Sequence, residues 1–412
     1  MKKIFSIFCC VLVVFLAACS NNTVHAQELS KRFTAEQVET LAVDDAFVAS
    51  YNELSANLIK TAYSSDNALI SPLSIELAFS MLTNGAVGKT KEELESFLGG
   101  MDIETFNKYN KAYVNSIKES EGFSFGVANS IWLKNDEKLS VKDRFLQTNA
   151  NYYAAQVYSA DFDNSTLNDI NNWVSDNTNG MIKKIIDKID KDTVMYLINA
   201  ICMEAEWQAK FEENEVIDQD FTNLDGSKTQ VKMMRSSEYN YISYGNATGF
   251  MKKYKGGRFA FLGLLPNEGV SISDFVSSLT GDELKKYFTS TDEKVRIKMP
   301  KMKVEYDLNL INTLQKLGVT EVFNPYLANL TDMATYKDAN IYISMAKHKT
   351  FMEVDTNGTK AAAVTIIAGG VNAAPSEEQP KYVTLDRPFV YGIIDMENKM
   401  PIFLGVKDAF NV

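Results

Sequence analysis

Residues Asn357 to Gln379 read NGTKAAAVTIIAGGVNAAPSEEQ, a run of small and apolar residues with neither the period of a helix nor the alternation of a strand. The flanking segments AKHKTFMEVD (346–355) and KYVTLDRPFVYGIID (381–395) are rich in β-branched and aromatic residues, which predicts a strand on each side. The run therefore connects two strands. Connections of this length without structure of their own are usually functional or disordered.

Composition places this run in a large folded domain. The chain has 412 residues, 45% of them hydrophobic, and only 8 prolines, which favours a globular protein. Apolar residues recur at helical spacing over 46–63, 73–83 and 168–174, whereas strand signals cluster from Thr193 onward. We expect one α+β domain over 42–412, with a mostly helical N-terminal half and a large mixed β-sheet.

Charge and residue counts exclude several functions. The net charge of −11 disfavours a nucleic-acid partner, because phosphates would repel the chain. His25 and His348 are the only histidines, so we expect neither a metal site nor a cofactor. Cys202 lies in an apolar strand segment, which favours a buried thiol over a catalytic one. No GxSxG motif accompanies His348, so a serine hydrolase is disfavoured and we expect no enzyme.

The N-terminus reads MKKIFSIFCCVLVVFLAACSNN, two lysines followed by an apolar stretch that ends at Ala18. This pattern is typical of a targeting segment, and about 15 apolar residues are short of the ~20 that span a bilayer. LAAC at 16–19 resembles a bacterial lipobox, which implies a signal peptide over 1–18, an acylated Cys19 and a tether over 19–41. Cleavage of a secretory signal after Ala26 remains the alternative.

Six segments in order within the expected domain of about 370 residues resemble the serpin family. They are NALISPLSIELAFSMLTNGAVGKT (67–90), INNWVSDNTNGMI (170–182), LINAICMEAEW (197–207), VRIKMPKMKVEYDLNLINTLQKLGV (295–319), GTKAAAVT (358–365), and LDRPFVYGIID (385–395) with IFLGVKD (402–408). The resemblance implies a serpin fold whose exposed reactive-centre loop lies at about 356–380. After a protease cuts this loop, the part before the cut inserts into the large sheet as a new strand, as in the serpin example of strand addition.

The hinge of the loop suits such insertion. The resemblance assigns it to Gly358, Thr359, Ala361, Ala362, Ala363 and Thr365. Because alternate strand residues share a face, Thr359, Ala361 and Ala363 would be buried together, whereas Lys360 would point to the other face. No proline interrupts the ladder before Pro375.

Other positions match further family features. Ser71, Ser74, Asn199 and His348 resemble the shutter, the polar cluster beneath the point where the sheet strands part. Trp207 resembles the tryptophan at the top of the sheet, where the loop first enters.

Two positions depart from the family pattern. Thr356 stands where the family usually has a glutamate, so we expect its ion pair with Lys301 to be missing. Val364 is larger than the usual alanine or glycine.

These features predict a suicide inhibitor that forms a covalent acyl-enzyme complex with endopeptidases. The alternative is a non-inhibitory serpin that acts as a binding protein of the cell envelope. We expect a monomer on the bacterial envelope or secreted, which meets membranes only through its lipid anchor.

Two ways of counting along the loop give different positions for the bond that the protease would cut. Fifteen residues from Gly358 place the attacked carbonyl at Asn372, with Val371 and Ala373 as neighbouring candidates, whereas counting back from the downstream strand points near Glu377. The hinge count is preferred, because the inserting side must match the length of the sheet. Small uncharged residues there predict elastase-like or subtilisin-like serine proteases as targets, with cysteine proteases as a second class.

Overall fold

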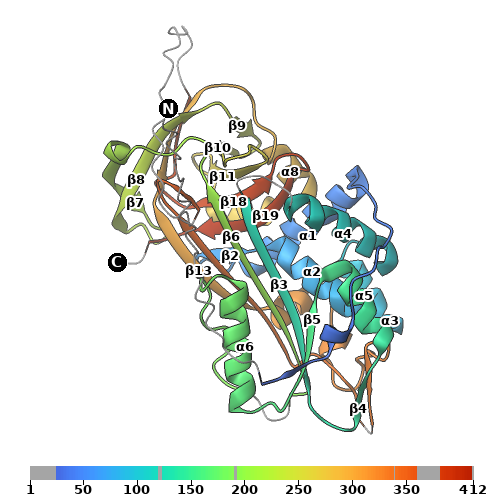
Figure 1. The fold of residues 1–412 in the computed structure, drawn as a ribbon. Helices are drawn as coiled ribbons and strands as arrows, with labels where there is room; N and C mark the ends of the chain where they lie inside the picture. The colour runs from blue at the N-terminus through green and yellow to red at the C-terminus, as the bar shows by residue number, and fades with distance from the viewer. Residues whose placement is uncertain (1–24, 119–122, 190–192, 338, 360–380, 411–412) are drawn as a thin grey trace, which may run out of the picture.

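The fold is that of a computed structural model, which describes residues 25–118, 123–189, 193–337, 339–359 and 381–410. Helices and strands are mixed without strict alternation, which confirms the predicted α+β class (Figure 1). The helices are α1 (Asp45–Ala62), α2 (Pro72–Thr83), α3 (Gly88–Phe97), α4 (Ile103–Lys118), α5 (Asp143–Tyr153), α6 (Asn164–Asn177), α7 (Ile272–Ser278), α8 (Gly281–Tyr287) and α9 (Leu310–Lys316). The three helices expected from apolar spacing correspond to α1, α2 and α6.

The largest sheet has, among the described residues, seven strands in the order β1-β5-β3-β6-β16-β15-β13. They are β1 (Gln27–Glu28), β3 (Phe123–Lys134), β5 (Gln156–Ala160), β6 (Met195–Glu206), β13 (Met302–Asn309), β15 (Met345–Val354) and β16 (Gly358–Thr359). The long strands β3 and β6 pair antiparallel, whereas β15 runs parallel to β6. This is the large mixed sheet that the sequence predicted.

Three smaller sheets complete the described strands. The first has the order β2-β19-β18-β11-β10-β9, the second β17-β12-β8-β7, and the third pairs β14 with β4. Their bounds are β2 (Ala68–Ile70), β4 (Leu139–Val141), β7 (Val216–Thr222), β8 (Lys228–Glu238), β9 (Tyr241–Tyr244), β10 (Ala247–Lys253), β11 (Phe259–Pro266), β12 (Val295–Pro300), β14 (Ala334–Tyr336), β17 (Lys381–Thr384), β18 (Phe389–Asp395) and β19 (Met400–Lys407). Short 3-10 turns are η1 (Ser30–Arg32), η2 (Glu213–Glu215) and η3 (Glu321–Phe323).

Helix α2 lies at the centre of the fold. Ser71 caps its first turn by accepting a hydrogen bond from the Ser74 N–H, and Pro72 occupies the first helical position, where no N–H is needed. Every residue of the helix is buried. It contacts both β6 and β19, so it packs between the large sheet and the six-stranded sheet. A helix that is buried on all sides is typical of such a position.

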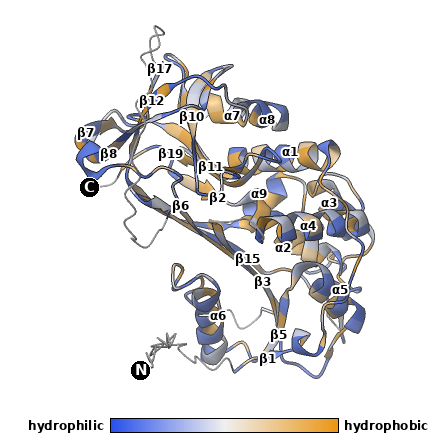
Figure 2. Ribbon diagram, turned by 45° about the horizontal axis from the view of Figure 1, so that its top comes forward, coloured by the Kyte–Doolittle hydropathy of each residue, from blue (hydrophilic) through white to orange (hydrophobic). Residues whose placement is uncertain are grey.

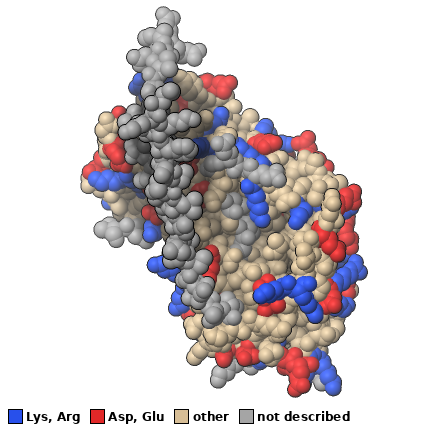
Figure 3. All heavy atoms as spheres, viewed as in Figure 1, with Lys and Arg blue, Asp and Glu red and all other residues tan. Residues whose placement is uncertain are grey.

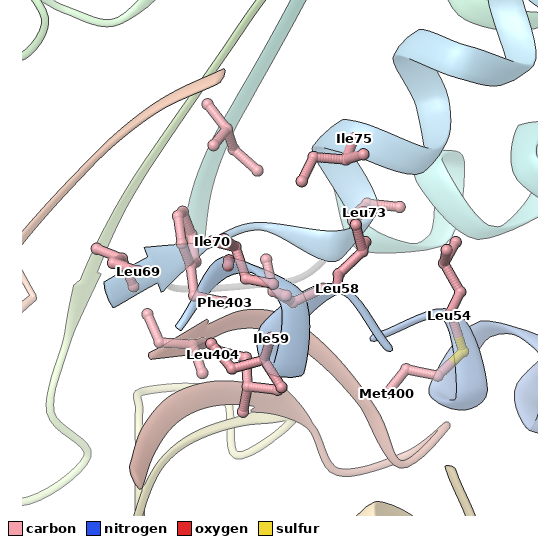
Figure 4. Packing of buried hydrophobic residues seen from close by; sticks show 14 of the residues in the cluster. Leu54, Leu58, Ile59, Leu69, Ile70, Leu73, Ile75, Met400, Phe403 and Leu404 are labelled. Carbon is pink, nitrogen blue, oxygen red and sulfur yellow. The ribbon is translucent and has the colours of Figure 1, made fainter. Parts of the chain in front are cut away.

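The main core joins α1 to the six-stranded sheet (Figure 4). Leu58 and Ile59 of α1 belong to the same cluster as Leu69 of β2 and Leu404 of β19, and all four are fully buried. Burial of each such side chain contributes roughly 1.5–3 kcal/mol. This apolar packing holds the segment that carries Ser71 in a fixed position beneath the large sheet.

The two faces of the large sheet are covered differently. Tyr196 and Ile198 of β6 belong to a second apolar cluster that includes Trp173 of α6, whereas Leu197 and Ile201 belong to the main core. Figure 2 shows α6 on the opposite side of the sheet from α2 and α4. Alternate residues of β6 therefore face different layers, as strand geometry requires.

Part of the segment expected to be a tether, 19–41, contacts the fold in the described structure. The backbone N–H groups of His25 and Ala26 each donate to the Asp169 carboxylate at 2.8 Å. Gln27 then pairs with Ser159, so β1 forms one edge of the large sheet. A buried carboxylate that needs donors holds this segment against the sheet, and a composition-based assignment could not reveal that partner.

The N-terminal half also contains a long strand that was not predicted from the sequence. β3 spans 12 residues, FSFGVANSIWLK, between α4 and α5. Its glycine, serine and asparagine residues obscure the strand pattern, because they are common in turns. The long antiparallel pairing with β6 outweighs this local preference.

Candidate functional site

The large sheet is parted at one end between β6 and β15. The two strands pair directly from Tyr196–Met345 to Ile201–Thr350. Beyond that point β16 lies between them, with Gly358 opposite Glu206, and Thr359 opposite both Ala205 and Val354. Two residues of the predicted hinge thus already occupy the sheet as a short antiparallel strand.

Gly358 allows this entry because the backbones approach closely. A Cβ added at this position would lie 2.0 Å from the Ala205 carbonyl oxygen and 2.9 Å from the Glu206 Cα. Thr359 is buried, and its hydroxyl lies 2.6 Å from the Tyr254 hydroxyl. The structure therefore places Thr359 on a buried face.

A tight turn joins β15 to β16. The Asp355 carboxylate accepts hydrogen bonds from the N–H groups of Asn357 (2.7 Å) and Gly358 (3.2 Å). The Asp355 N–H in turn donates to the Gly358 carbonyl at 3.0 Å. Asp355 was not singled out from the sequence, although an aspartate two residues before Asn-Gly is a turn signal.

Trp207 holds this turn from the end of β6. Its backbone N–H donates to the Asn357 carbonyl at 2.9 Å, and its indole N–H donates to the Asp355 carbonyl at 2.8 Å. The indole also stacks on the Tyr254 ring, with centroids 4.4 Å apart. Trp207 thus lies where the chain enters the sheet.

Thr356 is linked to Lys301 through a third residue. Its hydroxyl donates to one oxygen of the Glu213 carboxylate, and the other oxygen lies 3.5 Å from the Lys301 Nζ. The hydrogen bond from Thr356, followed by the charge of Lys301, lowers the pKa of Glu213. A direct pair between positions 356 and 301 is missing, as expected from the sequence, but Glu213 bridges them. Sequence reasoning missed Glu213 because it lies 143 residues away from Thr356.

The predicted shutter residues Ser71, Ser74, Asn199 and His348 form one buried network. His348 and Asn199 pair in register on β15 and β6, and the His348 Nδ1 lies 3.0 Å from the Asn199 Oδ1. The Asn199 Oδ1 also accepts from the Ser74 hydroxyl, while the Asn199 amide donates to the Ser74 carbonyl at 2.8 Å. The network therefore ties β6 and β15 to the first turn of α2.

Asn129 extends this network to a third strand. It pairs with Asn199 in the β3–β6 ladder, and its Oδ1 accepts from the Asn199 amide at 2.5 Å. Sequence reasoning missed Asn129 because it lies in the strand that was not predicted. Polar groups on three adjacent strands thus satisfy one another.

The tautomer of His348 follows from its partners. The Ser71 backbone N–H donates to its Nε2 at 3.1 Å, so the proton lies on Nδ1 and is donated to Asn199. Burial lowers the pKa of His348 to about 3. The Ser71 hydroxyl donates instead to the Ile402 carbonyl at 2.8 Å. Both imidazole nitrogens are thus engaged, which disfavours a role as general base.

Cys202 is buried on β6, in the apolar strand setting expected from the sequence. Several other predicted site residues lie outside the described residues: Cys19, Ala361, Ala362, Ala363, Val364, Thr365, Val371, Asn372 and Ala373.

Two kinds of site are absent from the described part of the chain. No helix in these ranges combines the length and the apolar character that a membrane crossing requires. Within the same residues, histidine, cysteine and carboxylate side chains form no group of three or more that could hold a metal ion.

Comparisons with known proteins agree with this geometry. Residues 49–408 match the family model described as Serpin (serine protease inhibitor). Human neuroserpin is 30% identical over 382 residues, which cover 88% of this chain and 90% of that protein. An uncharacterized serpin-like protein of Thermococcus kodakarensis is 27% identical, and the match covers 96% of both chains.

Solved structures show the same fold. The thermophilic serpin tengpin in its native state is 38% identical, with a TM-score of 0.89 over 93% of this chain and 100% of that one. Tengpin in its latent state is 37% identical and gives a TM-score of 0.80 over 91% and 100%. The chain belongs to the serpin family, whose members are in general protease inhibitors rather than enzymes.

Proposed function

We propose that this chain is an irreversible inhibitor of endopeptidases that acts by inserting its cleaved loop into the large sheet. The observation that carries this proposal is the position of β16 between β6 and β15. Extending β16 by further loop residues would require the pairs from Tyr196–Met345 to Ile201–Thr350 to separate. The greater similarity to native than to latent tengpin supports a starting state in which most of the loop is outside the sheet.

The proposed chemistry belongs to the target protease. The hydroxyl of its catalytic serine attacks the carbonyl carbon of Asn372, and the Asn372–Ala373 bond breaks. The new amine of Ala373 takes the proton, and Asn372 remains as an ester on the protease. Insertion of the strand that begins at Gly358 would then move this ester by roughly 50 Å, at about 3.4 Å per residue.

The energy available for this movement is sufficient. A new strand of about 15 residues would form on the order of 15–20 backbone hydrogen bonds, each worth about 1 kcal/mol net. When β6 and β15 separate, each of them pairs with the new strand instead, so their backbone hydrogen bonds are replaced and not lost. The total free energy of these new hydrogen bonds is comparable with a typical domain stability of roughly 5–15 kcal/mol. The native fold would therefore be metastable before cleavage.

The hinge composition supports insertion. Ala361, Ala362 and Ala363 carry side chains small enough to enter a narrow gap. Thr359, two residues before Ala361, is already buried in the sheet. A non-inhibitory serpin acting as an envelope binding protein is the competing function. The loop of such a protein would not insert, so it would need no small residues at these positions.

We further propose elastase-like or subtilisin-like serine proteases as targets, and cysteine proteases as a second class. Val371, Asn372 and Ala373 are small and uncharged, so they suit shallow apolar pockets and offer nothing to the acidic pocket of a trypsin-like enzyme. Mass spectrometry of the C-terminal fragment released from the trapped complex tests this assignment. A fragment that begins at Asn372, Ala373 or Ala374 supports it, whereas one that begins at Glu378 or Tyr382 contradicts it.

The lipobox-like sequence supports a lipid anchor at Cys19 and a location on the bacterial envelope. There the inhibitor would protect the cell from external proteases, as a monomer. Changing Cys19 to Ala should release the protein from the membrane fraction. Continued membrane attachment of this variant would contradict the anchor.

The inhibitor proposal is tested by incubation with a panel of serine and cysteine proteases. We expect a protease-sized shift that survives SDS and heating, together with a heat-stable cleaved form. Cleavage of the loop with neither product would contradict inhibition by insertion and favour the binding protein.

A further inference from the structure

A basic cavity lies on one face of the four-stranded sheet. Its volume is about 600 Å³. Strands β8, β12 and β17 form its floor, and the segment around η2 forms a wall. The lining residues are Lys210, Phe211, Glu212, Glu215, Arg235, Ser236, Ser237, Arg296, Ile297, Lys298, Tyr382 and Thr384.

Strand register places the polar floor residues side by side. Lys298 of β12 is opposite Arg235 of β8 and opposite Thr384 of β17. In the neighbouring row, Arg296 is opposite both Ser237 and Tyr382. Positions two apart on a strand share a face, so both rows point to the same side.

The other side of this sheet is apolar. Met234, Met299 and Val383 alternate with the floor residues, and all three are buried. The sheet therefore separates a core face from a face that concentrates positive charge.

The positive charges of the floor are poorly compensated. Like charges directly opposite each other destabilise a pair of strands, yet Lys298 faces Arg235. Arg235 has Glu215 as a partner at 3.0 Å, whereas the partner of the Lys298 Nζ among the described residues is the neutral Gln219 amide oxygen at 3.1 Å.

Arg296 is in a similar position. Its guanidinium donates to the Tyr382 hydroxyl at 3.3 Å and lies over the same ring. Within the described ranges, neither Arg296 nor Lys298 has a carboxylate at ion-pair distance.

The positive charge of this cavity contrasts with the chain as a whole, which has 53 acidic and 42 basic residues. On the face shown in Figure 3, acidic and basic side chains are interspersed. Among the described residues, four cations and two carboxylates line the cavity, so the charge of this lining is opposite in sign to the net charge of the chain. A ligand with several negative charges would compensate Arg296 and Lys298 together.

We propose that this cavity binds a compact oxyanion carried by a small polar molecule, namely a phosphate or sulfate ester. Arginine and lysine side chains are the usual partners of such groups, and a guanidinium can donate two parallel hydrogen bonds to them. Ser237 and Thr384 add hydroxyl donors, and the exposed ring of Tyr382 offers a flat surface to the organic part. The volume lies within the range of small-molecule sites, roughly 300–1,000 Å³.

Binding would also join two strands. β17 has only four residues and pairs with β12 directly after the loop. A ligand that contacts Arg296 and Thr384 together would hold β17 on the sheet. The ligand should therefore raise the thermal midpoint of the intact protein, because it binds the folded state only.

The test is calorimetric titration of the mature protein with tripolyphosphate, glucose 6-phosphate and glucose 6-sulfate at constant ionic strength. The variant Arg296→Gln/Lys298→Gln removes two charges from the cavity. Its matched control, Lys228→Gln/Lys232→Gln, removes two charges from the same sheet outside the cavity. Lys298→Gln alone provides a second variant should the double variant fail to fold.

We expect saturable one-to-one binding that weakens at least about tenfold in the cavity variant, since hydrogen bonds to charged groups are lost. The control variant should bind like the parent. A preference for glucose 6-phosphate or for glucose 6-sulfate identifies which ester is the ligand. Absence of saturable binding by all three probes, or equal weakening in both variants, would overturn the proposal. The assay uses no protease, so its outcome is independent of the proposed inhibition.

Discussion

The Thr359 hydroxyl lies 2.6 Å from the hydroxyl of Tyr254, and both side chains are buried. Thr359 is one of the two residues that enter the sheet between β6 and β15. The start of the new strand is therefore built into the intact protein, and insertion would extend a strand that already exists.

Replacing Thr359 with arginine should convert the inhibitor into a substrate. A charged side chain at this buried position would be costly to desolvate, so it would displace β16 from the sheet. Insertion would then lack its starting strand and would slow, and the protease would complete hydrolysis. We expect most of the protein to appear as cleaved product rather than as SDS-resistant complex, and the same for Ala361→Arg. Thr335→Arg, at an exposed position of β14, provides the control and should trap protease like the parent. Equal trapping by Thr359→Arg would contradict the account.

The bridge from Thr356 through Glu213 to Lys301 predicts a rescue experiment. Thr356→Glu should lower the free energy of unfolding, because its carboxylate would lie beside that of Glu213. Adding Glu213→Gln should restore about 1 kcal/mol or more, since the new carboxylate could then pair with Lys301. Denaturant unfolding of the parent, both single variants and the double variant measures this coupling. Strictly additive effects would show that these residues do not interact.

His348 should make the native state sensitive to acid. Its pKa is lowered to about 3 by burial, from an ordinary value of 6.5. Between these values the unfolded state binds the proton and the folded state does not, so stability falls as the pH falls, by up to about 1.4 kcal/mol per pH unit. In His348→Gln this decline should be absent, whereas His25→Gln should retain it. Parallel pH profiles for the parent and His348→Gln would refute this role.

Glu76 of α2 predicts the opposite trend. Burial raises its pKa from 4.5 to about 8, so the folded state retains a proton that the unfolded state releases. Its contribution to stability is present below pH 4.5 and is lost as the pH rises toward 8. Glu76→Gln keeps the oxygen that accepts from Ser80 and Asn110, and its stability relative to the parent should grow from pH 5 to pH 9. Thermal unfolding at several pH values checks this, and a constant difference would contradict it.

The local sequence pattern was sufficient to predict many helices and strands of this fold. The spacing of apolar residues predicted α1, α2 and α6, and β-branched runs predicted β6 and β15, because each element is long and buries a continuous face. The family resemblance also named Ser71, Asn199 and His348, which the structure brings together in one network.

The rest depended on partners distant in the sequence. β3 is a strand because β6 pairs along its length, and the segment from His25 is held by Asp169. Glu213 bridges Thr356 and Lys301 only after the sheet has formed. None of these contacts has a local signal, so sequence pattern alone could not predict them.

The central claim, that β6 and β15 must separate to admit the loop, is tested most directly by a disulfide lock. Ala200 and Lys349 are paired in register, and adjacent strands lie about 4.8 Å apart, within the range that a disulfide spans. The variant Ala200→Cys/Lys349→Cys is made with Cys202→Ala, so that the native thiol cannot compete. The yield of SDS-resistant complex with a target protease is then measured in oxidised and reduced protein. We expect cleavage without complex in the oxidised protein and restored complex in the reduced protein. Equal yields of complex in both states would show that these strands need not separate.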